Sequence, residues 1–226
     1  MRILHWNIHG WVDADGVDNV DRVIEVIRDA APDVVSLVEV DEPWGDSIKL
    51  RKVADTLGYH WAFVPAFEYR ETGGFGNALL ANRTLKAVQQ WQLLPPMLYD
   101  GTEPSEPRAV VVAQVDTAFG AVAVGSTHFP RSDGARRKHA GARLLDVCQN
   151  LTDPFVICGD FNQPASSWVP ASITVDPSEP VATYPTATPD EAIDYCLSSG
   201  LSIDDCTTID TDASDHLPIL AAGVAR

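Results

Sequence analysis

The sequence has no long hydrophobic run. Its 226 residues contain no stretch of about 18 consecutive apolar residues, so no segment is predicted to span a membrane. The first ten residues, MRILHWNIHG, carry His5, Asn7 and His9 where a signal peptide would need its apolar centre. We therefore expect a cytoplasmic protein.

The sequence also lacks a metal-binding pattern of cysteines. Its four cysteines, Cys148, Cys158, Cys196 and Cys206, show no CxxC spacing. In a cytoplasmic protein free thiols are more common than disulfides, and cysteine zinc sites use closely spaced ligands. We expect free buried thiols and no zinc site.

Basic residues are scarce, above all in the second half of the chain. The net charge is −16, and the segment from Leu144 to Ala225 has no Lys or Arg but 13 Asp or Glu residues. Binding to nucleic acid depends on basic residues that neutralise phosphates. The composition therefore disfavours a general duplex nuclease, although solubility alone also explains an acidic surface.

One basic cluster stands out against this background, and it follows a histidine at the end of a predicted strand. It comprises Arg131, Arg136, Arg137, Lys138 and Arg143. These side chains either form a solvated helix face or hold a phosphate or another anion of the substrate. The sequence leaves both alternatives open.

The rest of the composition is that of a globular protein, and we expect one domain over residues 1–226. Apolar periodicity predicts helices at 17–31, 47–57 and from 132 or 133 to 150. It predicts strands at 2–8, 33–40, 60–66, 76–82, 85–93, 108–116, 120–128, 154–160, 192–199 and 217–224. Residues 163–190 are expected to form ordered loops. Short hairpin links favour a two-sheet α/β sandwich with helices outside over a doubly wound parallel sheet.

Polar residues of catalytic types follow or end several predicted strands. They are Asn7, Glu39, His128, Asp160, Asn162, Asp194 and the segment 214–216, Ser-Asp-His. Each one alone is weak evidence, but together they predict one functional rim held by a rigid scaffold. In ICGDFNQP, residues i and i+2 of an extended chain point the same way, so Asp160 and Asn162 should project side by side. A capped turn is the alternative for this stretch.

These residue types suit the hydrolysis of a phosphoester. Carboxylate and amide oxygens without a Cys or a paired His nearby favour Mg²⁺ or Mn²⁺ over zinc, and such a cation neutralises phosphate charge. A carboxylate beside an amide can accept a proton from water. A His paired with an Asp stays protonated to higher pH and can stabilise developing negative charge.

Several motifs resemble those of the endonuclease/exonuclease/phosphatase superfamily, the DNase I-like hydrolases. They are WNIHG (6–10), LVEV (37–40), GNALLAN (76–82), THF (127–129), GDFN (159–162), IDY (193–195) and SDHLP (214–218), in the family's order. The resemblance implies a four-layer α/β/β/α sandwich, in which two mixed β-sheets pack face to face with helices outside.

The same resemblance implies a role for each matching position. The implied metal ligands are Glu39, Asn7 and Asp215. The implied catalytic residues are Asp160, Asn162, His128, His216 and Asp194. Asp160 would deprotonate the attacking water, Asp194 would pair with His216, and His128 would stabilise the phosphate or protonate the leaving oxygen. The expected substrate contacts are Arg108, Asn77 and Arg131.

The substrate is the least determined part of the prediction. The charge favours a small phosphorylated substrate, a diester or a monoester, over a nuclease that acts on single strands or ends of DNA or RNA. A scaffold that lost catalysis is disfavoured because every position that the mechanism needs is filled. We expect a monomer that uses Mg²⁺ or Mn²⁺.

Overall fold

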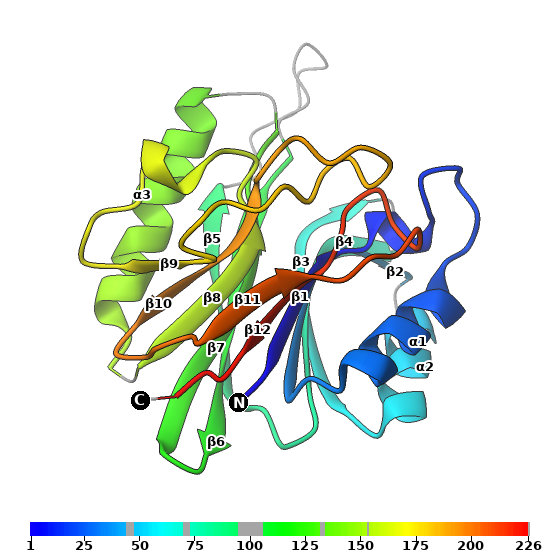
Figure 1. The fold of residues 1–226 in the computed structure, drawn as a ribbon, viewed down its shortest axis with the longest axis horizontal. Coiled ribbons are helices and arrows are strands. Elements are labelled where there is room, and N and C mark those ends of the chain that lie inside the picture. Colours follow the sequence, from blue (N-terminus) through cyan, green and yellow to red (C-terminus); the bar gives the residue numbers. More distant parts are fainter. Residues whose placement is uncertain (44–47, 70–72, 95–105, 132–133, 153, 226) are drawn as a thin grey trace.

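The computed structural model describes residues 1–43, 48–69, 73–94, 106–131, 134–152 and 154–225. Two sheets of six strands pack face to face, and helices lie on their outer faces (Figure 1). Helices α1 (Val20–Ala30) and α2 (Ile48–Leu57) cover one sheet, and α3 (Gly134–Asn150) covers the other. This arrangement confirms the predicted four-layer sandwich.

Both sheets are mixed, with parallel and antiparallel neighbours. The first has the order β11-β12-β1-β2-β4-β3, with strands Asp205–Thr208, Ile219–Ala222, Ile3–Asn7, Val34–Pro43, Gly73–Ala81 and His60–Tyr69. The second has the order β5-β6-β7-β8-β10-β9, with strands Lys86–Leu94, Arg108–Thr117, Gly120–His128, Phe155–Asp160, Asp194–Ser199 and Thr174–Asp176. Short 3-10 turns occur at His9–Trp11 and Ala165–Ser167.

An apolar core lies between each two neighbouring layers, which gives three cores. The central core lies between the sheets and includes Ile3, Val34, Val111 and Val156. A second core joins the first sheet to α1 and α2 through residues such as Trp6, Ile24 and Leu50. A third joins the other sheet to α3 through Val110, Leu144 and Ile157. Burial of these side chains, at about 25 cal/mol per Å² of apolar surface, drives the layers together.

The strand predictions are confirmed in place, with shifts at the ends and two omissions. Strands β9 and β11 were not predicted, because short segments such as Asp205–Thr208 show little apolar alternation. Helix α1 begins at Val20 rather than at 17 because the side chain of Asp13 accepts hydrogen bonds from the amides of Asp15 and Val17 and holds a turn there. Ser47 and the proposed helix start at 132 or 133 lie outside the described residues.

The cysteine prediction is wrong for one pair. Cys158 and Cys196 form a disulfide, with Cα atoms 4.0 Å apart. They lie directly opposite each other on the antiparallel strands β8 and β10, a contact that their separation of 38 residues does not reveal. Cys148 and Cys206 are free as predicted, and burial raises the pKa of each thiol to about 12.

Alternation along the strands carries polar residues to one edge of the sandwich. In β1, Ile3 faces the central core, and because side chains two residues apart point to the same face of a strand, His5 and Asn7 face the same way. In β8, Val156 and Cys158 fill the core and Asp160 follows them at the strand end.

Register then aligns the polar ends across the second sheet. His128 pairs with Asp160 across the parallel strands β7 and β8, and Asp194 pairs with Asp160 across β8 and β10. The folded sheet therefore places three catalytic-type side chains next to one another.

None of the described helices is both long enough and apolar enough to cross a membrane.

Candidate active site

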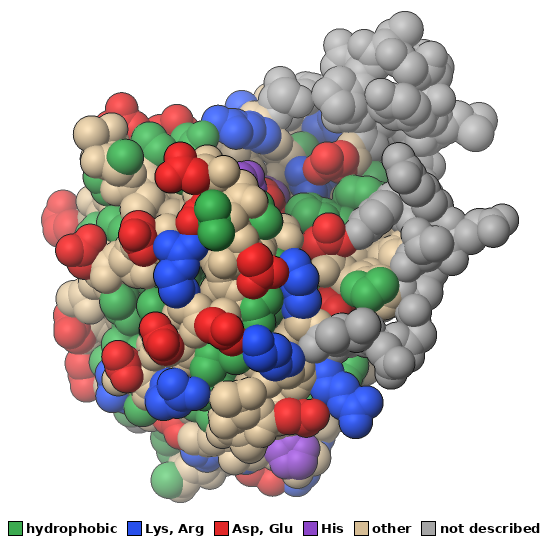
Figure 2. Space-filling view, turned by 90° about the vertical axis from the view of Figure 1, so that its right-hand side faces the viewer, with side chains coloured by type: hydrophobic (Ala, Val, Ile, Leu, Met, Phe, Trp, Pro, Cys, Tyr) green, Lys and Arg blue, Asp and Glu red, His purple; other side chains and the backbone are tan. Residues whose placement is uncertain are grey.

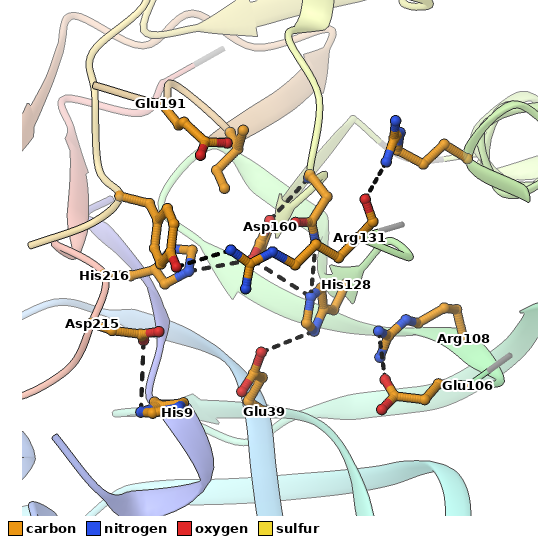
Figure 3. Close-up of a pocket in the computed structure, with 14 residues that line it drawn as sticks. His9, Glu39, Glu106, Arg108, His128, Arg131, Asp160, Glu191, Asp215 and His216 are labelled. Carbon is orange, nitrogen blue, oxygen red and sulfur yellow. Dashed lines mark hydrogen bonds and ion pairs between the residues drawn. The ribbon is translucent and has the colours of Figure 1, made fainter. Parts of the chain in front are cut away.

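A cavity of about 560 Å³ opens at this edge of the sandwich (Figure 3). Fourteen described residues line it, and Ile193 is the one apolar residue among them. The others are His9, Glu39, Glu106, Arg108, His128, Arg131, Arg137, Asp160, Asn162, Tyr184, Glu191, Asp215 and His216. Most of the predicted site residues therefore come together in one polar cleft.

A β-bulge delivers Glu39 to the cleft. The register between β2 and β4 shifts between Leu37 and Val40, and both of these residues pack on the helical side of the sheet. Glu39 is the extra residue, with a φ of +57°, a conformation that a side chain other than glycine rarely adopts. Such strain is concentrated at functional sites. The bulge turns the carboxylate of Glu39 into the cleft.

Asn7 holds two carboxylates with one amide group. Its Nδ2 donates to Oε1 of Glu39 and to Oδ2 of Asp160, each at 3.1 Å. Its Oδ1 accepts a hydrogen bond from the backbone amide of His9. Asn7 is thus beside the implied metal ligand, as expected, and in this arrangement it bridges that ligand to Asp160.

The GDFN stretch is both a turn and part of the site. Strand β8 ends at Asp160, and Asn162 has a φ of +51°, so the two side chains do not extend in parallel as the strand pattern predicted. The backbone amide of Asn162 donates to Oδ1 of Asp160 at 2.9 Å. The side-chain Nδ2 of Asn162 donates to the carbonyl of Phe129 and lies 3.1 Å from Nε2 of His128. The turn fixes one oxygen of Asp160 and leaves the other to face the cleft histidines.

Asp194 lies at the centre of a buried hydrogen-bonded chain. Its Oδ2 accepts from Nδ1 of His216 at 2.8 Å and from the hydroxyl of Thr183 at 2.5 Å. Its Oδ1 lies 3.2 Å from Nε2 of His5, whose Nδ1 lies 2.9 Å from the hydroxyl of Ser36. The expected Asp194–His216 pair is present, and His5 extends it across the two sheets.

The ionisable groups of this hydrogen-bonded network differ widely in pKa. Burial lowers the pKa of His216, but the charge and hydrogen bond of Asp194 outweigh it and raise that pKa to about 10. Burial also raises the pKa of Asp194, yet its contacts with His216 and His5 hold it well below the usual range. Burial and the charge of Asp194 raise the pKa of Asp160 to about 7. His216 is therefore a cation at neutral pH beside a carboxyl that can exchange a proton.

His128 has the opposite character. Burial, followed by the positive charges of Arg108 and His216, lowers its pKa well below the ordinary value. Its Nε2 lies 3.5 Å from Oδ2 of Asp160, and its buried Nδ1 has no hydrogen-bond partner. Two histidines of different charge thus flank Asp160, since Nε2 of His216 lies 3.7 Å from the same oxygen.

The donor set fits a hard divalent cation. Burial, and to a lesser degree the charge of Asp215, raise the pKa of Glu39, although the hydrogen bond from Asn7 and the charges of His216 and His9 oppose the rise. The buried Nδ1 of His9 has no hydrogen-bond partner and lies 3.9 Å from Oδ1 of Asp215. Carboxylate oxygens are the ligands that hard divalent cations prefer.

A second set of acidic and histidine atoms also lies close enough to hold a metal. Among the described residues, Asp160, Asp194 and His216 bring ligand atoms within 4.8 Å of one another. However, both oxygens of Asp194 and Nδ1 of His216 are engaged in hydrogen bonds. Glu39 and Asp215 are therefore the better candidates for metal ligands, and Asp160 is the one member of the second set that also lines the cleft beside them.

The three predicted substrate contacts differ in position. Arg108 and Arg131 line the cleft, whereas Asn77 is buried and donates through Nδ2 to the carbonyl of Ala109. Asn77 therefore joins the two sheets and is not brought into the cleft.

Sequence reasoning missed several residues of the site. They are His5, His9, Thr183, Tyr184, Glu106, Glu191 and Arg137 as a lining residue. His5 had a usable signal, because the alternation Ile3, His5, Asn7 puts it on the same face as Asn7. Tyr184 and Glu191 lie in a Pro- and Thr-rich loop without periodicity, so no pattern pointed to them.

We expect His5→Ala to lower kcat about 10-fold with little change in KM. Asp194 loses a charge-assisted hydrogen bond, and with it part of the alignment of His216. Ser36→Ala is the matched control, because Ser36 contacts His5 and not Asp194. Steady-state kinetics on protein shown to be folded would test this, and an unchanged kcat in His5→Ala would assign His5 a structural role only.

The fold and the site together define a phosphoester-hydrolase type of centre, with crowded carboxylates and a buried Asp–His pair at the edge of a two-sheet sandwich. A sequence model of the endonuclease/exonuclease/phosphatase family matches residues 4–216. The chain belongs to this family, whose members hydrolyse phosphoesters in nucleic acids or in phosphorylated small molecules. No curated protein sequence gives a significant match.

Several solved structures share the fold of this chain. An endonuclease/exonuclease/phosphatase from Beutenbergia cavernae is 22% identical, with a TM-score of 0.77, and the match covers 98% of this chain and 70% of that one. The human Nocturnin catalytic domain with bound sulfate is 20% identical, with a TM-score of 0.76 over 98% and 92% of the chains. A mannosyl-6-phosphatase from Bacteroides thetaiotaomicron is 14% identical, with a TM-score of 0.79 over the full length of both. These likenesses show the DNase I-like fold.

Proposed function

We propose that this protein is a metal-dependent phosphoesterase that hydrolyses a small phosphorylated substrate with Mg²⁺ or Mn²⁺. The observation that carries the proposal is the placement of Asp160, whose pKa is about 7, between the cation His216 and the neutral His128. A base near neutrality beside a fixed cation suits proton removal from water and stabilisation of a phosphate. We further propose that residues 1–226 act as one domain and as a monomer.

Each residue has a role that its contacts support. Asp160 accepts a proton from water as the water oxygen bonds to phosphorus and the ester P–O bond breaks. Protonated His216 donates to the phosphate, and it rather than neutral His128 can supply the proton for the leaving oxygen. Asn162 and Arg108 hold phosphate oxygens. Glu39 and Asp215 would hold the cation, which neutralises phosphate charge when bound.

The size and charge of the cleft support a small substrate. A volume of about 560 Å³ is within the range of pockets that bind small molecules. Figure 2 shows acidic and basic side chains interspersed on the face of the molecule that carries α1 and α2, without a continuous basic stripe. The mannosyl-6-phosphatase of the same fold is named for a small phosphorylated substrate, whereas a nuclease would need a basic track.

Hydrolysis of p-nitrophenyl phosphate and bis-p-nitrophenyl phosphate tests the proposal. We expect release of p-nitrophenol with Mg²⁺ or Mn²⁺ and its loss with EDTA. The preference between monoester and diester would then select the next substrates. If release occurs only from oligonucleotides, the enzyme is a nuclease, and if no ester is hydrolysed with any metal, the proposed function is wrong.

We expect Glu39→Gln to raise the Mg²⁺ concentration needed for half-maximal activity by about 10-fold or more. Removing one carboxylate removes a charged oxygen that suits a hard cation. Glu25→Gln, on the exposed side of α1, is the matched control. Isothermal titration of the metal gives an independent reading, and identical titrations for the variant and the wild type would exclude Glu39 as a ligand.

A further inference from the structure

Two of the arginines that line the cleft make no ion pair with a described residue. Among the described residues, no carboxylate lies within ion-pair distance of Arg131 or Arg137, while Arg108 pairs with Oε2 of Glu106 at 2.7 Å. Arg131 donates to the hydroxyl of Tyr184 at 3.0 Å, and its guanidinium carbon lies 5.1 Å from the centre of that ring. Arg137 donates to the backbone carbonyl of Arg131. The hydrogen-bond partners of both guanidinium groups are thus neutral, and the charges of Glu191 and Asp215 act on Arg131 only from beyond ion-pair distance.

Among the described residues, several other basic side chains do have an acidic partner. The net charge is −16, and other basic side chains, such as Arg22, Arg83 and Lys86, form ion pairs with Asp residues. The Nε of Arg137 is also buried without a hydrogen-bond partner. Buried donors of this kind normally find an acceptor. Two cationic side chains of the cleft without an ion-pair partner among the described residues therefore suit an anionic ligand.

We propose that Arg131 and Arg137 form a second anion subsite, and that the substrate is a small sugar or polyol phosphoester that carries a second phosphate. This inference rests on the proposed function, because the first phosphate is the one hydrolysed beside Asp160. Guanidinium groups suit phosphate, since their planar donors can bind two oxygens at once. Arg137 also lies in the first turn of α3, at the positive end of the helix dipole.

The two subsites are close enough for one small molecule. The ring of Tyr184 packs 4.7 Å from the ring of His216, and the same ring contacts Arg131. The second subsite is therefore separated from the catalytic imidazolium by a single aromatic side chain. Figure 3 shows Arg131 reaching over the cleft toward His216, with Arg108 and Glu106 on the other side of His128.

The remaining lining residues favour a sugar or polyol over a nucleotide. Apart from the histidines, Tyr184 is the one aromatic residue among the described lining residues, and it is already in contact with Arg131 and His216. A nucleobase would lack a free aromatic ring on which to stack. Glu106 and Glu191 instead present carboxylates that accept hydrogen bonds from hydroxyl groups.

A comparison of glucose 1,6-bisphosphate with glucose 6-phosphate tests the subsite. We expect kcat/KM for the bisphosphate to be about 10- to 100-fold higher, mainly through KM, because a charge-assisted contact to one phosphate is gained. In the variant with Arg131→Gln and Arg137→Gln this preference should collapse toward one. Arg143→Gln, on the same helix and outside the cleft, is the matched control and should retain the full preference.

The outcomes separate the subsite from the proposed function. If p-nitrophenyl esters are hydrolysed but the bisphosphate is not preferred, or if the double variant loses activity on both sugars equally, the subsite is wrong and the phosphoesterase stands. If no ester is hydrolysed, calorimetric binding of glucose 1,6-bisphosphate still decides. Binding that the double variant loses and Arg143→Gln keeps supports the subsite, and binding that all proteins share, or none shows, overturns it.

Discussion

Asp160→Asn should reduce turnover at least about 10³-fold and leave the protein as stable as the wild type or more stable above pH 7. The loss of turnover follows because asparagine cannot accept the proton of the attacking water. The backbone contact should persist, since an amide oxygen can still accept from the amide of Asn162, whereas the contact with Nδ2 of Asn7 is lost. Rates with p-nitrophenyl esters at saturating metal would measure the first effect.

The stability effect follows from the raised pKa of Asp160. Burial and the charge of Asp194 raise that pKa from 3.8 to about 7, so the folded state holds the proton more tightly than the unfolded state. As pH rises from about 4 to 7, ionisation of this group therefore reduces the stability of the metal-free protein. Asparagine mimics the protonated form and avoids this loss.

Denaturant unfolding of the metal-free proteins at pH 4.5 and pH 8 measures this difference. The two proteins should be nearly equal at the lower pH, and the variant should be the more stable at the higher pH. Asp146→Asn, on the exposed side of α3, is the control and should show no such crossover. A variant that is inactive and also less stable at pH 8 would mean that Asp160 supports the fold rather than the reaction.

Much of the site was predictable because strand alternation is a local property. Ile3, His5 and Asn7 share one face of β1, and Asp160 follows the core residues of β8 at the same edge. The period of two therefore brings Asn7 and Asp160 together once the sheets pack. The family motifs mark the same residues, which is why most of them line one cleft.

The parts that were not predictable depend on backbone irregularity or on register. Glu39 reaches the cleft through a bulge, although an extended strand would have pointed it to the other face of the sheet, and Asn162 reaches the cleft through a left-handed turn rather than along the strand. The contact of Cys158 with Cys196 depends on how β8 pairs with β10. Such contacts link residues far apart in sequence, so they cannot be predicted from composition or periodicity.

The basic cluster contains both kinds of residue that the sequence left open, solvated helix residues and residues placed to bind an anion. Of its five members, Arg131 and Arg137 line the cleft, whereas Arg143 pairs with Asp146 on the exposed side of α3. An α-helix has 3.6 residues per turn, so charged residues that follow one another in sequence face different directions. The sequence identified the cluster, but the position of α3 against the cleft decides which charges meet a substrate.

Asp194→Asn should shift the basic limb of the pH–rate profile from about pH 10 to below pH 7 and lower kcat at pH 8 by about 10²- to 10⁴-fold. In the wild type, burial lowers the pKa of His216, but Asp194 more than offsets it and raises that pKa to about 10. Activity that requires the imidazolium is therefore retained until pH rises through about 10. Without the carboxylate, burial dominates and His216 loses its proton near or below neutrality.

The acid limb explains why the loss should be so large. Asp160 must be ionised to act as a base, so activity in the wild type falls as pH drops through about 7. The active window thus lies between about 7 and 10 in the wild type. In Asp194→Asn the pKa of Asp160 also falls, because the charge of Asp194 helps to raise it, but the pKa of His216 falls further, so only a small fraction of the enzyme holds both required forms and the maximum itself drops.

Thr183→Val is the matched control for this prediction. Thr183 donates to the same Oδ2 of Asp194, so the variant loses a hydrogen bond but keeps the charge that raises the pKa of His216. Its basic limb should stay near 10 while kcat falls modestly. His216→Ala and Asp194→Ala should cost similar factors, and their combination little more, because the two residues act as one unit. A basic limb still near 10 in Asp194→Asn would show that the charge of His216 does not control the reaction, and the assignment of His216 as the cationic donor would have to be withdrawn.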